Sequence, residues 1–147
     1  MKQSILRTGM IGAAVGTLAL GPQAFATQMT MPAEQGTGDI RYVSGGVGEA
    51  DAKTFEAEMD RYALAIELLE RTGRGSEFTA DATVEILEAG KPVLRTKSSG
   101  PFVLVNLPAG NYSVEATLAG RMVRKAGVVV AGGRHARARL EFPAHTD

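Results

Sequence analysis

The stretch Leu107-Pro108-Ala109-Gly110-Asn111-Tyr112 decides the expected fold of this chain. Pro108 fixes its own φ angle and Gly110 can adopt a positive one, so the segment should form a tight turn. Tyr112 follows at once, where a buried ring can return its hydroxyl group to the backbone of the loop, as in a tyrosine corner. We therefore predict that Leu107, Pro108, Gly110 and Tyr112 determine the fold and do not bind a ligand.

Segments of alternating apolar and polar residues extend from this turn in both directions. Such alternation places apolar side chains on one face of a strand and polar side chains on the other. Turn signals rich in Gly and Pro separate the segments, as is typical of a β-sandwich. The expected strands cover residues 64–69, 82–87, 93–96, 102–107, 112–118, 122–130 and 136–142. The prediction is an all-β, seven-stranded Greek-key sandwich of the prealbumin or immunoglobulin type, occupying residues 62–143.

A short helix is expected at residues 51–61, immediately before the sandwich. Phe55, Met59 and Tyr62 are spaced so that they form one apolar stripe along it. The helix could continue to Leu69, because Ala, Leu and Glu are good helix formers. The alternation that begins after Tyr62 favours a strand instead.

The expected strand at residues 102–107 is apolar on both faces between Phe102 and Val105. One face must contribute to the core. If the second apolar face were exposed to water, it would favour association with other molecules. We expect the helix at residues 51–61 to pack over this second face through its apolar stripe.

Residues 1–26 have the features of a secretory signal peptide. Two basic residues precede an apolar run from Gly9 to Leu20, and an A-x-A cleavage pattern ends at Ala26. The run is shorter than the ~20 apolar residues that a membrane-spanning helix needs. Cleavage after Ala26 would leave 121 of the 147 residues as the exported protein. The Gly-rich residues 27–50 show no sustained period, so we expect a flexible arm there.

The pattern L-x-x-G-x-Y-x-V, formed by Leu107, Gly110, Tyr112 and Val114, resembles that of the carboxypeptidase regulatory-like domains. The resemblance extends over roughly residues 42–142 and includes small secreted proteins of proteobacteria that carry this domain. It implies a transthyretin-like sandwich, an accessory role without catalysis, and a periplasmic or secreted location.

Residues suited to catalysis are few. The chain has no cysteine, and its histidines are His135, which we expect on an exposed strand face, and His145. Neither histidine lies in the H-E-x-x-H pattern of zinc peptidases, and no G-x-S-x-G supports a Ser-His-Asp triad. The transthyretin-like hydrolases that open 5-hydroxyisourate end in Tyr-Arg-Gly-Ser, which this chain lacks. We therefore expect no enzymatic activity, and a small hydrolase is the least favoured alternative.

Two further motifs are too incomplete to predict a ligand. Met29 and Met31 carry thioethers, which are soft ligands for Cu(I), but no histidine accompanies them. The segment Gly45-Gly46-Val47-Gly48 is not followed by the Lys and Ser or Thr of a phosphate-binding loop. We expect a flexible loop or the lead-in to the helix at Gly45–Gly48, and we expect neither a metal nor a cofactor.

Charge is distributed unevenly along the chain. Residues 27–90 hold 13 acids and 5 bases, whereas residues 91–147 hold 9 bases and 3 acids. One interpretation is a basic face that meets an acidic protein or an anionic envelope surface. That face would contain Arg121, Arg124, Lys125, Arg134, Arg137 and Arg139. The other interpretation is internal pairing, with outward Arg137 and Arg139 beside Glu67 on a neighbouring strand.

The expected function is a non-catalytic binding or accessory module that contacts a protein of the cell envelope. A carbohydrate or another envelope polymer is the alternative ligand, although the chain has no tryptophan and only three tyrosines for stacking against sugars. Nucleic acid is not an expected partner, because 16 basic residues balance 16 acidic ones over the whole chain.

Overall fold

The computed structural model describes residues 21–22 and 30–146. Apart from Gly21 and Pro22, the expected signal peptide at residues 1–26 lies outside the described residues. So do Met29 and the beginning of the expected arm. No helix in the described part of the chain is both long and apolar enough to cross a membrane.

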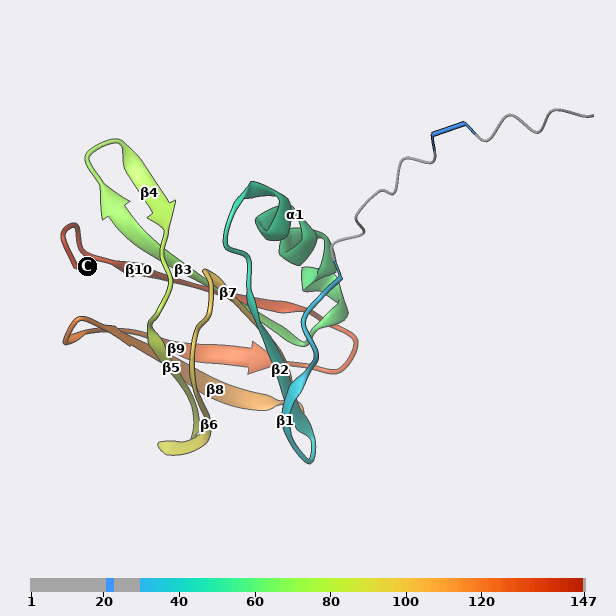
Figure 1. Ribbon diagram of the computed structural model, residues 1–147. Coiled ribbons are helices and arrows are strands. Elements are labelled where there is room, and N and C mark those ends of the chain that lie inside the picture. The colour runs from blue at the N-terminus through green and yellow to red at the C-terminus, as the bar shows by residue number, and fades with distance from the viewer. Residues whose placement is uncertain (1–20, 23–29, 147) are drawn as a thin grey trace, which may run out of the picture.

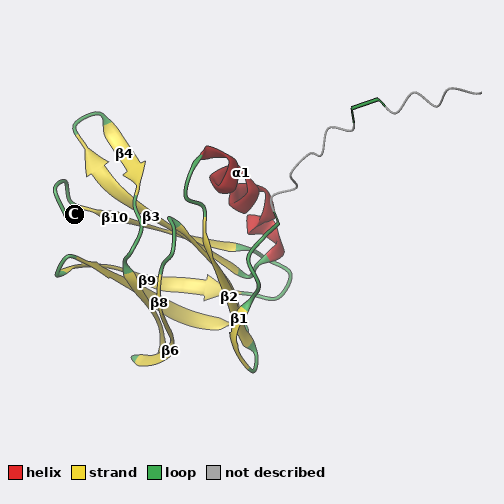
Figure 2. Ribbon diagram, viewed as in Figure 1, coloured by secondary structure: helices red, strands yellow, loops and turns green. Residues whose placement is uncertain are grey.

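Two β-sheets and one short helix form the described chain (Figures 1 and 2). The first sheet has the order β1-β2-β7-β3-β10, and β4 pairs with β3 outside this order. Its strands are β1 (Gln35–Thr37), β2 (Ile40–Gly45), β7 (Phe102–Asn106), β3 (Leu64–Thr72), β10 (Ala136–Phe142) and β4 (Gly75–Phe78). The second sheet has the order β6-β5-β8-β9. Its strands are β6 (Lys91–Lys97), β5 (Thr83–Glu88), β8 (Gly110–Leu118) and β9 (Arg121–Val130).

The inner faces of the two sheets share one apolar core. Alternate residues of β3 point into it, including Leu64 and Ile66, and they are fully buried. Val84 of β5 and Val114 of β8 meet them from the second sheet. Alternation along the strands therefore hides the inner face of each sheet from water, as expected.

The helix α1 (Glu49–Glu58) and the 3₁₀ turn η1 (Met59–Arg61) cover the outer face of the first sheet. Phe55, Met59 and Tyr62 are buried there against Phe102 and Leu104. The expected packing of the helix over the second apolar face of residues 102–105 is confirmed.

The sheets contain ten strands within the described residues, so the predicted number of seven is wrong. All seven expected segments form strands, and residues 64–69 belong to β3 rather than to a longer helix. The additional strands are β1, β2 and β4.

β1 and β2 lie in residues 27–50, where a flexible arm was expected. These residues form strands because β2 pairs with β7 from Arg41 to Gly45, and Val43 is buried beneath α1.

The turn before β8 has the expected hydrogen bond. The hydroxyl group of Tyr112 donates to the carbonyl oxygen of Pro108 at 2.6 Å, and the tyrosine ring is buried. Gly110 contributes differently from the expectation, because its φ angle is not positive. A β-carbon on Gly110 would lie 3.2 Å from the ring of Tyr112, so glycine leaves room for that ring.

Candidate functional site

A groove of about 510 Å³ opens between α1 and β4, and we name it the α1–β4 groove. Its lining is mainly apolar and comes from four parts of the chain: the lead-in to α1, one side of α1, the end of β4 with the residues that follow, and the turn before β7. The lining residues are Gly46, Val47, Gly48, Glu49, Ala52, Lys53, Glu56, Phe78, Thr79, Ala80 and Pro101. In Figure 1, β4 lies on the side of α1 where the chain enters the helix.

The groove exists because β2 ends before it can run beside β4. β3 pairs first with β7 and then, further along, with β4 on the same side. β2 pairs with β7 only as far as the pair Gly45 and Phe102. The next position of the sheet, beside β4, is therefore not filled by β2.

Gly46 turns the chain out of the sheet at this point. Its φ angle is +96°, and a β-carbon there would overlap the ring of Phe102. Its N–H donates to Oδ2 of Asp51 at 2.8 Å, which fixes the entry into α1. Within the segment Gly45–Gly48, Gly45 ends β2 and the other three residues form the lead-in to the helix, one of the two alternatives that the sequence left open.

Two exposed apolar side chains flank the groove. Phe78 at the end of β4 is 47% exposed, and Val47 before α1 is 65% exposed. The inner side of the Phe78 ring contacts Phe102, with centroids 5.0 Å apart and the rings inclined by 55°. Because Phe102 is fully buried, Phe78 extends the apolar layer beneath α1 outward to solvent.

Charged residues of α1 form the rim of the groove. Nζ of Lys53 lies 2.7 Å from Oε1 of Glu49, so these two charges compensate each other. Glu56 is exposed and forms no ion pair with any described residue. The rim therefore carries a net negative charge centred on Glu56.

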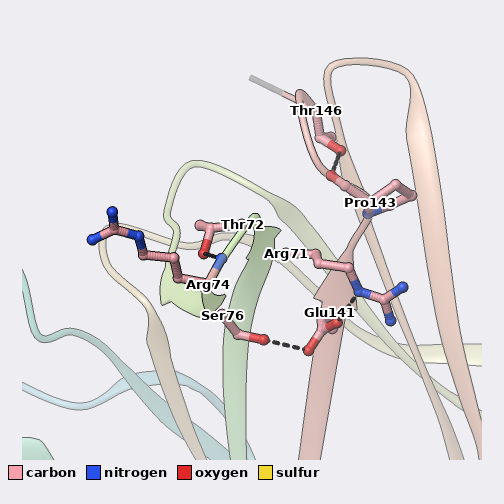
Figure 3. Close-up of polar contacts among 7 residues, drawn as sticks. All are labelled: Arg71, Thr72, Arg74, Ser76, Glu141, Pro143 and Thr146. Atoms are coloured by element: carbon pink, nitrogen blue, oxygen red, sulfur yellow. Dashed lines mark hydrogen bonds and ion pairs between the residues drawn. The ribbon is translucent and has the colours of Figure 1, made fainter.

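A polar network holds the β3–β4 hairpin against β10 (Figure 3). Nε of Arg71 donates to Oε1 of Glu141 at 2.8 Å, and Oγ of Ser76 donates to Oε2 of the same carboxylate at 2.6 Å. These hydrogen bonds, that of Ser76 first, lower the pKa of Glu141 from its ordinary value of 4.5. The network ties β4 to β10 through one carboxylate, so the wall of the groove that carries Phe78 has a defined position.

The six basic residues considered for an interaction face divide between the two sheets. Arg139 lies 3.2 Å from Glu67 on β3, which confirms the expected pairing, and Arg137 lies 3.8 Å from Asp60. Arg124 belongs to the second sheet and lies 3.7 Å from Glu115. The remaining three are exposed on β9 and in the turn before β10: Arg121, Lys125 and Arg134. Three of the six therefore have a carboxylate partner among the described residues.

His135 lies in the turn before β10 rather than in an exposed strand. Its Nδ1 donates to the carbonyl oxygen of Tyr62 at 3.1 Å. The ring borders a second cavity of about 240 Å³, together with Asn106 and Arg134.

A third cavity of about 360 Å³ lies beside Tyr62 and Glu34. Burial, and then the hydrogen bond to Glu34, raise the pKa of the Tyr62 hydroxyl.

The groove could not be predicted from the sequence, because its two exposed apolar residues stand apart from other apolar residues in the chain. Phe78 follows Gly75-Ser76-Glu77, and Val47 stands between glycines, so neither belongs to a periodic pattern. The only signal was the presence of a large apolar residue in an otherwise polar turn region.

The described residues contain no group of three or more acidic or histidine side chains that could hold a metal ion. No protein-family model matches this chain, and comparisons with curated proteins and with solved structures also give no significant match.

Proposed function

We propose that this chain is an exported, non-catalytic binding module whose partner is a protein of the cell envelope. The α1–β4 groove is the observation that carries the proposal. Its volume of about 510 Å³ lies within the range typical of binding pockets, and its lining is mainly apolar. Aromatic side chains are enriched at protein interfaces, and Phe78 is an exposed aromatic side chain of this groove.

Export is proposed from the signal-peptide pattern of residues 1–26. We also propose that the sandwich has the Greek-key, prealbumin-like topology of the carboxypeptidase regulatory-like domains. The hydrogen bond from Tyr112 to Pro108 supports this relation, because it lies in the part of the sequence that carries the resemblance.

The polar groups of the groove support recognition rather than catalysis. Charged groups that take part in catalysis commonly work in sites from which water is excluded. The carboxylate of Glu56 is exposed to solvent, and Glu49 and Lys53 pair with each other on the surface of α1. These groups lie where they can form ion pairs with charged side chains of a partner at the rim of the groove.

The exposed ring of Phe78 also supports a second candidate, binding of a carbohydrate. Sugars stack on aromatic rings that present one face to solvent. The same groove would then hold a glycan of the envelope, and the experiment below separates the two ligands.

The test is photo-crosslinking in living cells of the source organism with the full chain, exported by its own leader. A photo-reactive amino acid replaces Val47 at the groove, and in the matched control it replaces Met122, an apolar residue of β9 that is 60% exposed. We expect one dominant protein adduct from position 47 that is absent from position 122 and disappears with Phe78→Ala. An adduct that contains glycan but no protein would favour the second candidate. Equal adducts at both positions, or none at position 47, would overturn the proposal.

A further inference from the structure

We propose that the α1–β4 groove receives an extended segment of the partner, which adds as a strand to the free edge of β4. In this arrangement an apolar side chain of the segment lies against Phe78, and a basic side chain lies near Glu77 on the opposite face of β4. This inference rests on the proposed function and names the way in which the partner is held.

The free edge of β4 follows from its register with β3. The N–H of Thr79 donates to the carbonyl oxygen of Leu68 at 3.0 Å, in the same register as the pairs of β4 with β3. In an antiparallel ladder, residues that bond to the partner strand alternate with residues whose polar groups point away. The backbone groups of Ser76 and Phe78 therefore point away from β3, and no strand in the described chain pairs with that side of β4.

An edge with unpaired N–H and C=O groups is a ready template for another strand. Recognition of extended peptides by this route combines backbone hydrogen bonds with pockets for alternate side chains. The α1–β4 groove supplies both, because it adjoins the free edge of β4 and is lined by Val47, Ala52 and Phe78. A residue of the added strand on the same face as Phe78 would place its side chain within the groove.

Charge favours a basic partner segment over a second copy of this chain. Glu77 is exposed on β4 itself and forms no ion pair with any described residue. Pairing β4 with β4 of a second copy would place the Glu77 carboxylates of both copies on one short strand pair, and such like charges are destabilising there. A segment that alternates apolar residues with Lys or Arg complements both faces of β4, because its apolar side chains lie beside Phe78 in the groove and its basic side chains lie on the face that carries Glu77.

The decisive comparison is between Ser76→Pro and Ser76→Ala. Both variants lose the hydroxyl group that bonds to Glu141, but only proline also removes the outward N–H of residue 76. Proline is tolerated in a strand where the N–H faces solvent. With the photo-reactive residue at position 47, we expect the yield of protein adduct to be about fivefold lower for Ser76→Pro than for Ser76→Ala, as for the loss of one net hydrogen bond.

Equal yields from the two variants would overturn strand addition while leaving the proposed function intact. Absence of any adduct at position 47 in the unsubstituted chain would instead defeat the proposed function itself. The two failures are therefore distinguishable.

A second measurement does not depend on the folding of the proline variant. The unsubstituted protein is mixed with the synthetic peptide acetyl-Lys-Val-Lys-Val-Lys-Val-amide, and amide hydrogen exchange is followed by NMR. At a peptide concentration about ten times Kd, exchange at Ser76 and Phe78 should slow about tenfold. The same peptide with every backbone amide N-methylated has no N–H on either edge, so it cannot pair as a strand and should have no such effect. No slowing with the first peptide, or equal slowing with both, would contradict the proposal.

Discussion

The rings of Phe55 and Phe102 are stacked, with centroids 5.9 Å apart and planes inclined by 19°. Both side chains are fully buried, although they come from the helix and from the outer face of the first sheet. This contact joins α1 to β7 and makes the helix part of the folded domain. It also fixes the side of α1 that borders the groove.

Replacing Phe55 by alanine should therefore lower the free energy of unfolding by about 3–5 kcal/mol, the usual cost of removing a buried phenylalanine side chain. Urea unfolding measures this change, and hydrogen exchange should show lost protection along α1. Lys53→Ala is the matched control on the same helix, because Lys53 is exposed and should change stability by less than about 0.5 kcal/mol. A loss of less than about 1 kcal/mol for Phe55→Ala would show that α1 is only loosely attached.

The position of α1 could be predicted because two independent features of the sequence agree. Residues 102–105 are apolar on both faces, which requires a second cover, and the stripe containing Phe55 lies on the nearest helix. Tyr112 was predictable for a similar reason, since the turn and the ring lie within a few residues of each other. Arg139 and Glu67 also paired as expected, because they are direct neighbours in the register of β10 and β3.

The groove could not be predicted because it depends on where strands end. β4 is a four-residue strand of exposed residues, and it forms because β3 is longer than β7 and offers it an edge. β2 could not be predicted for a related reason. Glycine and serine interrupt its alternation of apolar and polar residues, and its stability comes from pairing with β7. Such long-range pairing outweighs local propensity, so local patterns do not reveal it.

Gly100 should tolerate no side chain, because a β-carbon there would overlap the backbone of Gly45. We expect Gly100→Ala to lower the free energy of unfolding by at least about 1–3 kcal/mol, as overpacking does in a core. Gly132→Ala is the control, since its β-carbon would meet no atom within 4 Å. Thermal unfolding of the two variants measures the difference. Equal stability would mean that β2 and the turn before β7 are not packed closely together.

Tyr112→Phe removes the hydroxyl group that bonds to Pro108 and should cost about 0.5–1.5 kcal/mol. Burial, and then the charge of Glu88, raise the pKa of Tyr112 above its ordinary value of 10.0. The folded pKa thus exceeds the unfolded one, so this contribution to stability is present below pH 10.0 and is lost as the pH rises through the folded pKa. The phenylalanine variant should lose less stability in alkali, as measured by urea unfolding at several pH values.

Tyr42→Phe serves as the comparison for this experiment. Its hydroxyl group donates to the side chain of Gln35 and accepts from Thr96, and it makes no bond within the turn before β8. We expect a smaller effect from this substitution than from Tyr112→Phe. The opposite order would contradict the role of Tyr112 as the residue that closes the turn.

Ser76→Ala should raise the pKa of Glu141 toward 4.5, because the serine hydroxyl is the main cause of its lowering and Arg71 is the second. The ionised carboxylate accepts both bonds only in the folded protein, so its folded pKa lies below the unfolded one. Its contribution to stability is therefore present above pH 4.5 and is lost as the pH falls through the folded pKa. The variant should be less stable than the unsubstituted protein at neutral pH, and the difference should shrink in acid.

NMR titration of the Glu141 carboxyl carbon measures the pKa directly, and thermal unfolding against pH measures the linked stability. Ser113→Ala is the matched control, because the hydroxyl group of Ser113 accepts from Arg124 on the other sheet. That substitution should leave the pKa of Glu141 unchanged. If Ser76→Ala also leaves it unchanged, the hydroxyl group of Ser76 does not hold β4 to β10, and the wall of the groove must be positioned by the backbone pairing with β3 alone.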